Sequence, residues 1–570
     1  MNLTLLALGF LALLFAGYRL YGGFVARRFG LDDARATPAH EKQDGVDFVP
    51  TPPFYLFAQH FSAIAAAGPI AGPILACQTF GWLPCLAWIG LGVVLIGAVH
   101  DFASLIASIR HGGGSVAEIA RERLGRPAGR AMMAFIGIAL LYVIVAFTDI
   151  TSATFVTGTE ELVEQGVRFN PGGAVAFASA AYLALAVLMG LVQRRWNPPL
   201  WALTVVFVPA TFGVAWLGTS FSHLLVLPHA AWAVVILLYC AVASVVPVWA
   251  LLQPRGYLGG FVLYSALGIG VIGVLFGGYE IHQPAFKAWN TGASGGQLFP
   301  FLFVTIACGA CSGFHGLVCS GTTSKQVARE SHTRFVGYGA MLAEGFVALI
   351  ALVTVMMATS SELQDATGKA LSPGTIYGNG IGRFLTLLIG RENLPFAITF
   401  GAMAFSTFVF DTLDVATRLG RYIVQELTGW KGRVGAAAGT AATVLPAVLI
   451  LGFGGEGSWK KFWTLFGASN QLLAGLTLVA VAAWLKQEGK GRGFVLAPMV
   501  FVLGITLWAL ASIAVASFRE SRGLDVLLAN GIAALVLIGL ALFVLAAGWR
   551  RRGSPAAGEG LRRGSAAQST

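Results

Sequence analysis

Charged residues are scarce in this chain. Asp, Glu, Lys and Arg make up 11% of its 570 residues, whereas apolar residues make up 56%. With a mean hydropathy of +0.75, the chain carries more apolar surface than a water-soluble core can bury. The sequence also has no Gly-x-x-x-x-Gly-Lys-Ser/Thr segment, which argues against a nucleotide-driven engine within the chain. We therefore predict an all-α integral membrane protein whose energy source is an ion gradient.

Cysteine is also rare, and its placement argues against a disulfide framework. The six cysteines all lie in or at the edge of apolar runs, at Cys77, Cys85, Cys240, Cys308, Cys311 and Cys319. Cys308 and Cys311 with His315 still resemble a metal or redox site. Cys319 could be a fourth ligand, but Cys308 and Cys319 would be about 16 Å apart on a continuous helix. Cys308, Cys311, His315 and Cys319 can therefore all reach one ion only if the helix breaks.

Long polar linkers are missing too. The longest polar connections are 22–53, 279–297 and 360–393, and none separates two soluble domains. We predict a single polytopic membrane domain over residues 1–552 and a disordered cytoplasmic tail at 553–570, which is rich in Gly, Ser, Ala and Arg.

Apolar runs of roughly 17 to 25 residues predict about fifteen membrane spans. They lie near residues 3–21, 55–79, 83–108, 129–156, 172–192, 198–219, 230–252, 259–276, 298–320, 335–359, 394–418, 433–452, 459–485, 494–518 and 525–548. Between two of them, the capping-box pattern from Ser115 to Glu118 and the stop at Gly125 predict a short interfacial helix over 116–124.

The positive charges fall mainly on one side of this topology. Placing the amino terminus outside puts roughly three quarters of the 37 Lys and Arg residues in cytoplasmic segments, as the positive-inside rule requires. This predicts an odd number of spans, with the amino terminus outside and the carboxyl terminus in the cytoplasm. The net charge of +11 then needs no nucleic-acid partner, because the lipid bilayer accounts for it.

Two apolar stretches, 61–78 and 306–323, contain residues that break helices. Proline removes a backbone donor and glycine adds backbone freedom, so each stretch is predicted to unwind within the membrane. Lipid cannot satisfy the freed backbone groups, which are tolerated only beside protein or a wet cavity. Paired interrupted helices are the sequence pointer to the substrate site of a transporter.

The half-helix that follows each break offers free amides and a positive dipole end, which suits an anion. Close helix packing is the alternative reason for small residues at such spacing. We predict that backbone groups at the breaks and nearby polar side chains bind the substrate. The predicted substrate-binding residues are Gly68, Pro69, Gly72, Pro73, Gln78, Gly309, Ser312, Gly313, Ser320, Thr322, Thr323, Asn470 and Gln471.

Ionisable side chains inside spans are costly and usually face an interior cavity. Those that we predict to carry the coupling proton or ion are His60, Asp101, His315, Glu344, Asp411 and Asp414. The acids near span ends have an alternative, since they could pair with an arginine such as Arg418 or Arg421. His60 could equally be a hydrogen-bonded packing residue.

Several segments resemble the carbon starvation protein A family of bacterial inner-membrane transporters, in family order over about residues 45–485. They are 49–78, Gly97–Phe102, Ala307–His315, Ser320–Thr323, Phe410–Tyr422 and Leu465–Ala474. The chain departs from the family pattern at His100 and Cys319, where glutamine and serine are usual, and by being compact toward its carboxyl end.

The resemblance implies uptake of small nutrients during carbon starvation, either pyruvate or short peptides, with proton coupling. It also implies a core like that of amino acid/polyamine/cation transporters, with inverted repeats, and a small cytoplasmic partner protein. We therefore predict a secondary active importer without a cofactor or enzymatic activity, coupled to protons or sodium. A passive channel and a membrane metal or redox protein that uses Cys308, Cys311 and His315 remain the alternatives.

Overall fold

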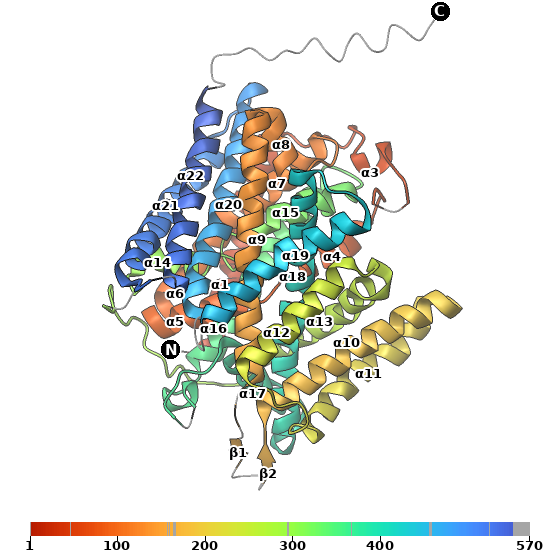
Figure 1. Ribbon diagram of the computed structural model, residues 1–570, viewed down its shortest axis with the longest axis vertical. Coiled ribbons are helices and arrows are strands. Elements are labelled where there is room, and N and C mark those ends of the chain that lie inside the picture. Colours follow the sequence, from red (N-terminus) through yellow and green to blue (C-terminus); the bar gives the residue numbers. More distant parts are fainter. Residues whose placement is uncertain are drawn as a thin grey trace, which may run out of the picture.

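The computed structural model shows a bundle of helices that run at varied tilts (Figure 1). It describes residues 2–550 except 46, 157, 159, 163–166, 293–295, 366, 455–458 and 524. The predicted tail at 553–570 lies outside the described residues.

The first half of the chain supplies thirteen α-helices. They are α1 (Leu3–Ala16), α2 (Gly23–Phe29), α3 (Pro38–Glu41), α4 (Pro53–Ile64), α5 (Gly68–Phe80), α6 (Trp82–Gly92), α7 (Ala98–Arg110), α8 (Val116–Leu124), α9 (Arg126–Phe155), α10 (Pro171–Trp196), α11 (Leu200–Ser220), α12 (His229–Val245) and α13 (Leu252–Phe276).

The second half supplies the rest. They are α14 (Leu298–Thr305), α15 (Gly313–Gly321), α16 (Ala340–Met356), α17 (Pro373–Ile389), α18 (Leu394–Thr428), α19 (Gly432–Gly454), α20 (Trp459–Gln487), α21 (Gly493–Glu520) and α22 (Val526–Arg550).

Short elements join or extend these helices. The π-helical segments η1 (Gly17–Gly22), η2 (Val93–Gly97) and η5 (Arg334–Gly339) continue into α2, α7 and α16. The 3₁₀ turns are η3 (Val248–Ala250), η4 (Thr323–Lys325), η6 (Ser361–Leu363) and η7 (Arg391–Asn393), and one antiparallel hairpin pairs β1 (Glu160–Leu162) with β2 (Val167–Phe169).

The prediction of about fifteen spans is not confirmed. Twelve described helices are long and apolar enough to cross a membrane, or up to thirteen when the bent pair α4–α5 counts as one span. The predicted span at 230–252 is α12, which has only 17 residues. The predicted span at 298–320 divides into α14 and α15, of 8 and 9 residues.

Helix α17 is a feature that hydropathy did not find, because it lies in the predicted polar connection 360–393. Its glycines, among them Gly378 and Gly382, lower the local hydropathy, yet they let α17 press against α18. A Cβ at Gly378 would lie 2.7 Å from the Ala402 Cβ, and one at Gly382 would lie 3.0 Å from the backbone of Ile398. Small residues thus make a buried helix here that apolar length does not reveal.

The centre of the bundle is formed by α9, α18 and α20, which pack against one another or on shared neighbours. All of the most apolar window of α20 is buried, compared with 22% for α11. Figure 1 shows the α10–α11 pair, in yellow, projecting from the side of the bundle. The central helices are therefore the ones that can hold polar groups away from lipid.

The predicted interfacial helix is confirmed as α8, with the same bounds and a complete capping box at Ser115 and Glu118. Figure 1 shows α3, α8 and the last turn of α22 at one end of the molecule and the β1–β2 hairpin at the other. The long axis of the bundle therefore separates two groups of connecting segments.

Candidate substrate and proton site

The first predicted break separates α4 from α5. Helix α4 ends at Ile64, α5 begins at Gly68, and the two axes differ by 47°. Pro69 lies at the first turn of α5, where its missing N–H costs no helical hydrogen bond, whereas Pro73 lies inside the helix and removes one. The glycines and prolines predicted to bind substrate are all buried.

The second predicted break is longer. Helix α14 ends at Thr305, α15 begins at Gly313, and residues 306–312 between them are not helical. Gly309 and Ser312 lie in this unwound segment, and both are buried. The sequence therefore predicted both interruptions at their correct positions.

The two breaks lie against each other. A Cβ at Gly68 would be 2.4 Å from the Cys308 sulfur, and one at Gly72 would be 2.5 Å from the carbonyl oxygen of Thr305. Gly309 lies on the opposite side of the contact, where an added Cβ would be 3.5 Å from the Pro69 Cα. Glycine is thus required here by the close approach of the first turns of α5 to the end of α14 and the unwound segment that follows it.

Helix α20 holds the second break in place. The Phe314 N–H, at the start of α15, donates to Asn470 Oδ1 at 2.8 Å, and Asn470 Nδ2 donates to Ser312 Oγ at 3.1 Å. At the end of α14, the Trp463 indole donates to the Thr305 carbonyl at 3.1 Å and Gln471 Nε2 donates to Phe303 O at 3.4 Å. These side chains satisfy backbone groups that the break leaves without helical partners.

Asn470 and Gln471 are therefore bonded to the protein itself. Their predicted contact with substrate stays a prediction, and the role that the structure shows is to cap the interrupted helix. Sequence alone gave no sign of Trp463 as a third member of this set.

A buried cluster of ionisable groups joins three helices beside the breaks. His315 on α15 lies between two carboxylates, with Nδ1 2.8 Å from Asp101 Oδ2 on α7 and Nε2 3.1 Å from Glu344 Oε2 on α16. His100 Nδ1 lies 2.8 Å from the other oxygen of Asp101. Each of these side chains is at most 1% exposed.

Glu344 is the least satisfied member of this cluster. Its Oε1 is buried and has no hydrogen-bond partner among the described residues. A buried acceptor without a partner is costly, so this oxygen is suited to gain a proton or to meet a transported molecule. Asp101, His315 and Glu344, three of the predicted coupling residues, are thus brought together.

His60 lies near this cluster but bonds elsewhere. Its Nδ1 is 2.8 Å from Thr323 Oγ1, and its Nε2 is 3.8 Å from the Cys319 sulfur. Ser320 accepts from the Val116 N–H at 3.2 Å and so connects α15 to α8, while Thr322 is exposed. These residues close the far end of α15 and are not gathered around the breaks.

Asp411 and Asp414 on α18 form a second cluster, in which Asp414 is buried and the Asp411 side chain is 26% exposed. Both carboxylates pair with the guanidinium of Arg255 on α13, and Asp414 Oδ2 lies 3.1 Å from Arg255 Nη1. Tyr239 donates to Asp414 Oδ2 at 2.8 Å. The alternative of pairing with an arginine is therefore what the structure shows, although the partner is Arg255 and neither Arg418 nor Arg421.

The predicted metal alternative can be compared with the geometry of the sulfur groups. Among the described residues, no group of three or more His, Cys, Asp and Glu side chains is placed to hold a metal ion. The Cys308 sulfur instead accepts a hydrogen bond from Asn470 Nδ2 at 3.1 Å and lies against Gly68.

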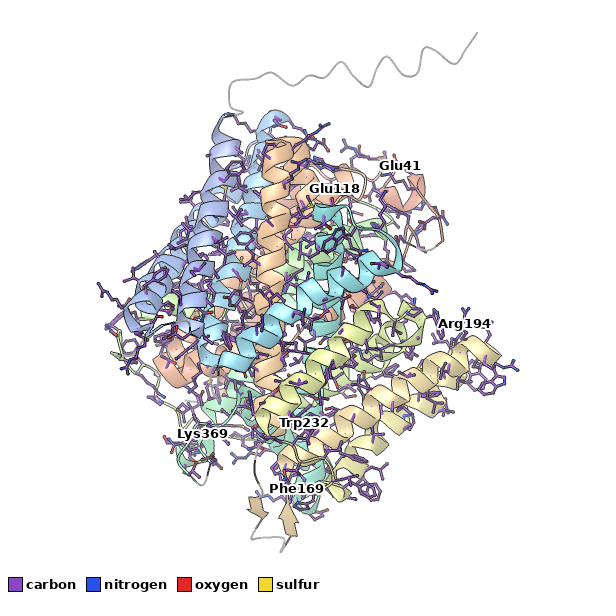
Figure 2. All side chains as sticks on the ribbon, viewed as in Figure 1. Glu41, Glu118, Phe169, Arg194, Trp232 and Lys369 are labelled. Atoms are coloured by element: carbon purple, nitrogen blue, oxygen red, sulfur yellow. The ribbon has the colours of Figure 1, made fainter. Side chains whose placement is uncertain are left out.

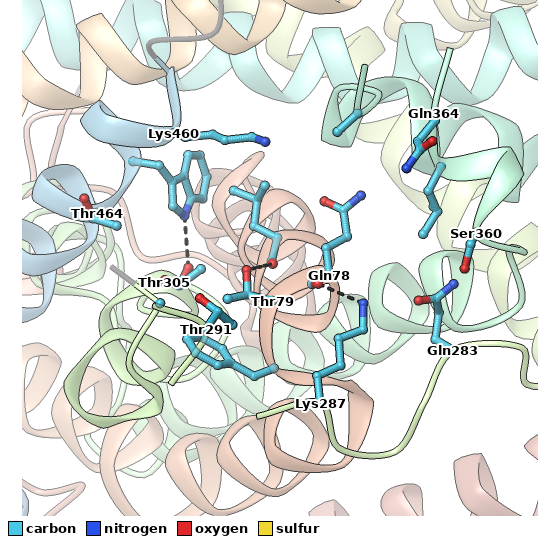
Figure 3. Close-up of a pocket in the computed structure, with 16 residues that line it drawn as sticks. Gln78, Thr79, Gln283, Lys287, Thr291, Thr305, Ser360, Gln364, Lys460 and Thr464 are labelled. Atoms are coloured by element: carbon cyan, nitrogen blue, oxygen red, sulfur yellow. Dashed lines mark hydrogen bonds between the residues drawn. The ribbon is translucent and has the colours of Figure 1, made fainter. Parts of the chain in front are cut away.

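A cavity of about 620 Å³ opens at the carboxyl end of α5. Gln78 near the end of α5 and Thr305 at the end of α14 both line it, so it reaches the point where the two interrupted helices meet. Lys287 and Lys460 reach toward it from separate elements (Figure 3), and Lys287 Nζ donates to the Gln78 carbonyl at 2.8 Å. Among the lining residues that the structure describes, none is acidic.

Gln78 is the one predicted substrate-binding residue among those lining this cavity. The two lysines are the residues that sequence analysis missed, because they lie far apart in the chain, Lys287 in the connection between α13 and α14 and Lys460 at the start of α20. A possible signal was their position, since they belong to the minority of positive residues outside the predicted cytoplasmic segments.

The fold and the site together define a class: a polytopic helical membrane transporter, and not an enzyme. A family model described as "Carbon starvation protein CstA" matches residues 1–372 and 358–509. The chain belongs to this family, which confirms the resemblance of its motifs.

Curated relatives agree with the family. The chain is 33% identical over 560 residues to a peptide transporter CstA of Helicobacter pylori, covering 86% of this chain and 79% of the relative. It is 31% identical to a peptide transporter CstA of Bacillus subtilis, covering 96% of each, and 31% identical to the pyruvate/proton symporter BtsT of Escherichia coli, covering 86% and 79%.

Among solved structures, a manganese transporter mutant of Eremococcus coleocola is similar with a TM-score of 0.46 and 12% identity, covering 87% of this chain and 95% of that one. The predicted inverted-repeat relation between the two halves stays a prediction.

Proposed function

We propose that this protein is a proton-coupled importer of a small carboxylate of the pyruvate class, and that it resides in the bacterial inner membrane. The observation that carries the proposal is the position of His315, which bridges Asp101 and Glu344 at the start of the half-helix that follows the second break. The name of the pyruvate/proton symporter among the relatives supports the same substrate and ion.

The charge of the His315 cluster gives a physical basis for coupling. Two carboxylates and one imidazolium leave a net negative charge, and one further proton on Glu344 would neutralise it. Buried charge is costly, so gain or loss of that proton changes which packing of α7, α15 and α16 is favoured. Because α16 also contacts the second break, through Ala348 against Gly309, the same rearrangement can reach the substrate.

The substrate class follows from the charge of the cavity. Lys287 and Lys460 both line the cavity and carry positive charge, and its described lining residues include no Asp or Glu. A cleft lined by one sign of charge concentrates ligands of the other sign. A monocarboxylate gains this attraction in full, whereas a zwitterionic peptide gains less, which is why we favour the carboxylate over the peptide.

The proposed orientation has the amino terminus outside and the carboxyl terminus in the cytoplasm. The positive-inside bias supports it, and so does the gathering of α3, α8 and the end of α22 at one end of the bundle. The lysine-lined cavity, built from the segments around 283–296 and 360–370, then opens outward, as an importer requires. The small cytoplasmic partner implied by the family stays a prediction.

The test is uptake by the purified protein in liposomes. Labelled pyruvate should accumulate when the interior is made alkaline, and an imposed sodium gradient at equal pH should give no accumulation. Accumulation that follows sodium alone, or that occurs only with labelled di- or tripeptides, would contradict the coupling ion or the substrate class, respectively.

Counterflow distinguishes a carrier from a passive channel. Liposomes loaded with unlabelled pyruvate should take up external labelled pyruvate transiently above equilibrium, because a carrier exchanges one molecule for another. Simple equilibration without this overshoot would contradict the carrier.

A further inference from the structure

A second cavity, remote from the helix breaks, lies at the end of α10. It measures about 600 Å³ and lies between α10, the start of α11, η3 and the start of α13. That volume is within the range of about 300–1,000 Å³ that is usual for small-molecule sites. None of the predicted substrate or coupling residues lines it.

The cavity is lined by one cation together with polar amides and aromatic rings. Its cationic residue is Arg194, whose guanidinium stacks on the Trp249 ring at 4.7 Å. Gln193 and Asn197 line the same wall, and the lining contains no Asp or Glu. Within the part of the chain that the structure describes, no carboxylate forms an ion pair with Arg194. Its charge is therefore held in position by an aromatic ring and is left uncompensated.

The backbone is shaped to make this cavity. Asn197 adopts a left-handed conformation with φ of 44°, which ends α10 and turns the chain into α11. Gly190 lets η3 approach α10, because a Cβ there would lie 2.7 Å from the Trp249 carbonyl oxygen. The close approach brings the Trp249 ring to Arg194, so the pairing is built into the fold.

The surroundings have the character of a membrane interface. Trp196 and Trp201, which flank the turn from α10 to α11, are 69% and 70% exposed. Exposed tryptophans concentrate where acyl chains meet headgroups. Leu200 and Val205 on α11 add exposed apolar surface beside the cavity, and Figure 2 shows Arg194 at the outer end of α10, away from the centre of the bundle.

We propose that this cavity binds the phosphate headgroup of an anionic phospholipid, with Arg194 as the phosphate-binding cation and the exposed surface of α11 against the acyl chains. A basic pocket between transmembrane helices at the interface is the arrangement that recognises such headgroups. Charge complementarity selects the anionic lipid over a zwitterionic one, and the apolar flank selects a lipid over a soluble phosphate.

The test is native mass spectrometry of the delipidated full-length protein titrated with phosphatidylglycerol or phosphatidylcholine. The wild type should bind phosphatidylglycerol preferentially, and Arg194→Gln should weaken that binding about fivefold, as expected for one cation near a membrane surface. Arg195→Gln is the matched control, because Arg195 is the next residue on the same helix but does not line the cavity, and it should bind like the wild type.

Three outcomes would overturn the proposal. These are equal binding of the two lipids by the wild type, equal phosphatidylglycerol binding by Arg194→Gln and wild type, and an equal loss in both arginine variants. A separate arm uses glycerol phosphate and inorganic phosphate, and binding of these as tight as that of the lipid would assign a soluble-anion site instead. Trp249→Leu provides a second variant, which should weaken lipid binding if the ring positions Arg194.

Discussion

Two ionic clusters among the described residues use different cations, and we propose different tasks for them. In one, His315 lies between Asp101 and Glu344. In the other, Arg255 lies between Asp411 and Asp414. Arginine stays charged at any physiological pH, whereas histidine gains and loses its proton near neutrality. Arg255 therefore joins α13 to α18 with a charge that does not change, whereas we propose that the His315 cluster carries the coupling proton.

Their surroundings agree with this division. Both clusters contain a buried carboxylate oxygen without a hydrogen-bond partner among the described residues, Glu344 Oε1 and Asp414 Oδ1. The His315 cluster differs in that it adjoins the unwound segment 306–312. The Arg255 cluster joins two continuous helices and is tied further by hydrogen bonds from Tyr239 to Asp414 and from Tyr182 to the Arg255 carbonyl. Sequence alone placed Asp411 and Asp414 with the coupling residues. That role stays a prediction, and the structure shows both carboxylates paired with Arg255.

The largest effect should come from removing the fixed charge. Arg255→Leu leaves the buried Asp414 and the partly exposed Asp411 without a counter-charge, and we expect it to cost about 3 kcal/mol of stability. The measurement is the melting temperature of the purified protein in detergent together with its yield. The triple variant Arg255→Leu, Asp411→Asn, Asp414→Asn should recover much of the loss, because no charge then remains. An Arg255→Leu variant that melts like the wild type would show that this cluster does not stabilise the packing of α13 against α18.

His315→Gln should affect uptake more than stability, in contrast to Arg255→Leu. The two carboxylates that it leaves can pick up a proton, so we expect a smaller stability loss than for Arg255→Leu, of about 1–3 kcal/mol. Uptake should fall by more than about tenfold, because the bridging group is lost. His223→Gln, at an exposed position, is the control and should transport normally. Near-normal uptake by His315→Gln would remove histidine from the coupling step.

Gly68→Ala tests whether contact between the breaks matters to transport. The added methyl group would overlap the side chain of Cys308, and we expect about 1–3 kcal/mol of overpacking cost and loss of uptake. Cys308→Gly in the same chain makes room for the methyl group and should restore part of both. Full transport by the Gly68→Ala variant would mean that the two unwound segments need not touch.

The smallest effect concerns approach of the substrate and should leave both clusters intact. Lys460→Gln removes one cation from the cavity that Lys287 and Lys460 line. We expect the KM for pyruvate to rise about twofold to fivefold, and this rise to shrink at high salt. Lys461→Gln is the matched control, because Lys461 is adjacent but does not line the cavity. Equal effects of both variants would point to the general charge of that surface.

Local chemistry made parts of this structure predictable. The Gly-Pro runs near 68–73 and the glycines near 309–313 interrupt a helix wherever they occur, so both breaks were placed correctly. The capping box of α8 is equally local. These features depend on residues within one or two helical turns of each other.

What sequence could not supply was pairing between distant segments. Asp411 lies 156 residues from Arg255, and nothing near either residue names the other as its partner. Helix α17 was missed for a related reason, because its glycines are favourable only against α18. The count of about fifteen spans is not confirmed, because hydropathy records apolar length and does not show that α14 and α15 are separate short helices.

The most direct measurement is proton movement driven by substrate alone. Liposomes containing the wild-type protein and a trapped pH indicator should acidify inside when pyruvate is added outside without any imposed gradient. Glu344→Gln should abolish this signal yet retain pyruvate counterflow, because neutralising the carboxylate removes the proton site and leaves exchange intact. Glu426→Gln, exposed on α18, should acidify like the wild type. Pyruvate-driven acidification that persists in Glu344→Gln would contradict the proposal that the His315 cluster carries the coupling proton.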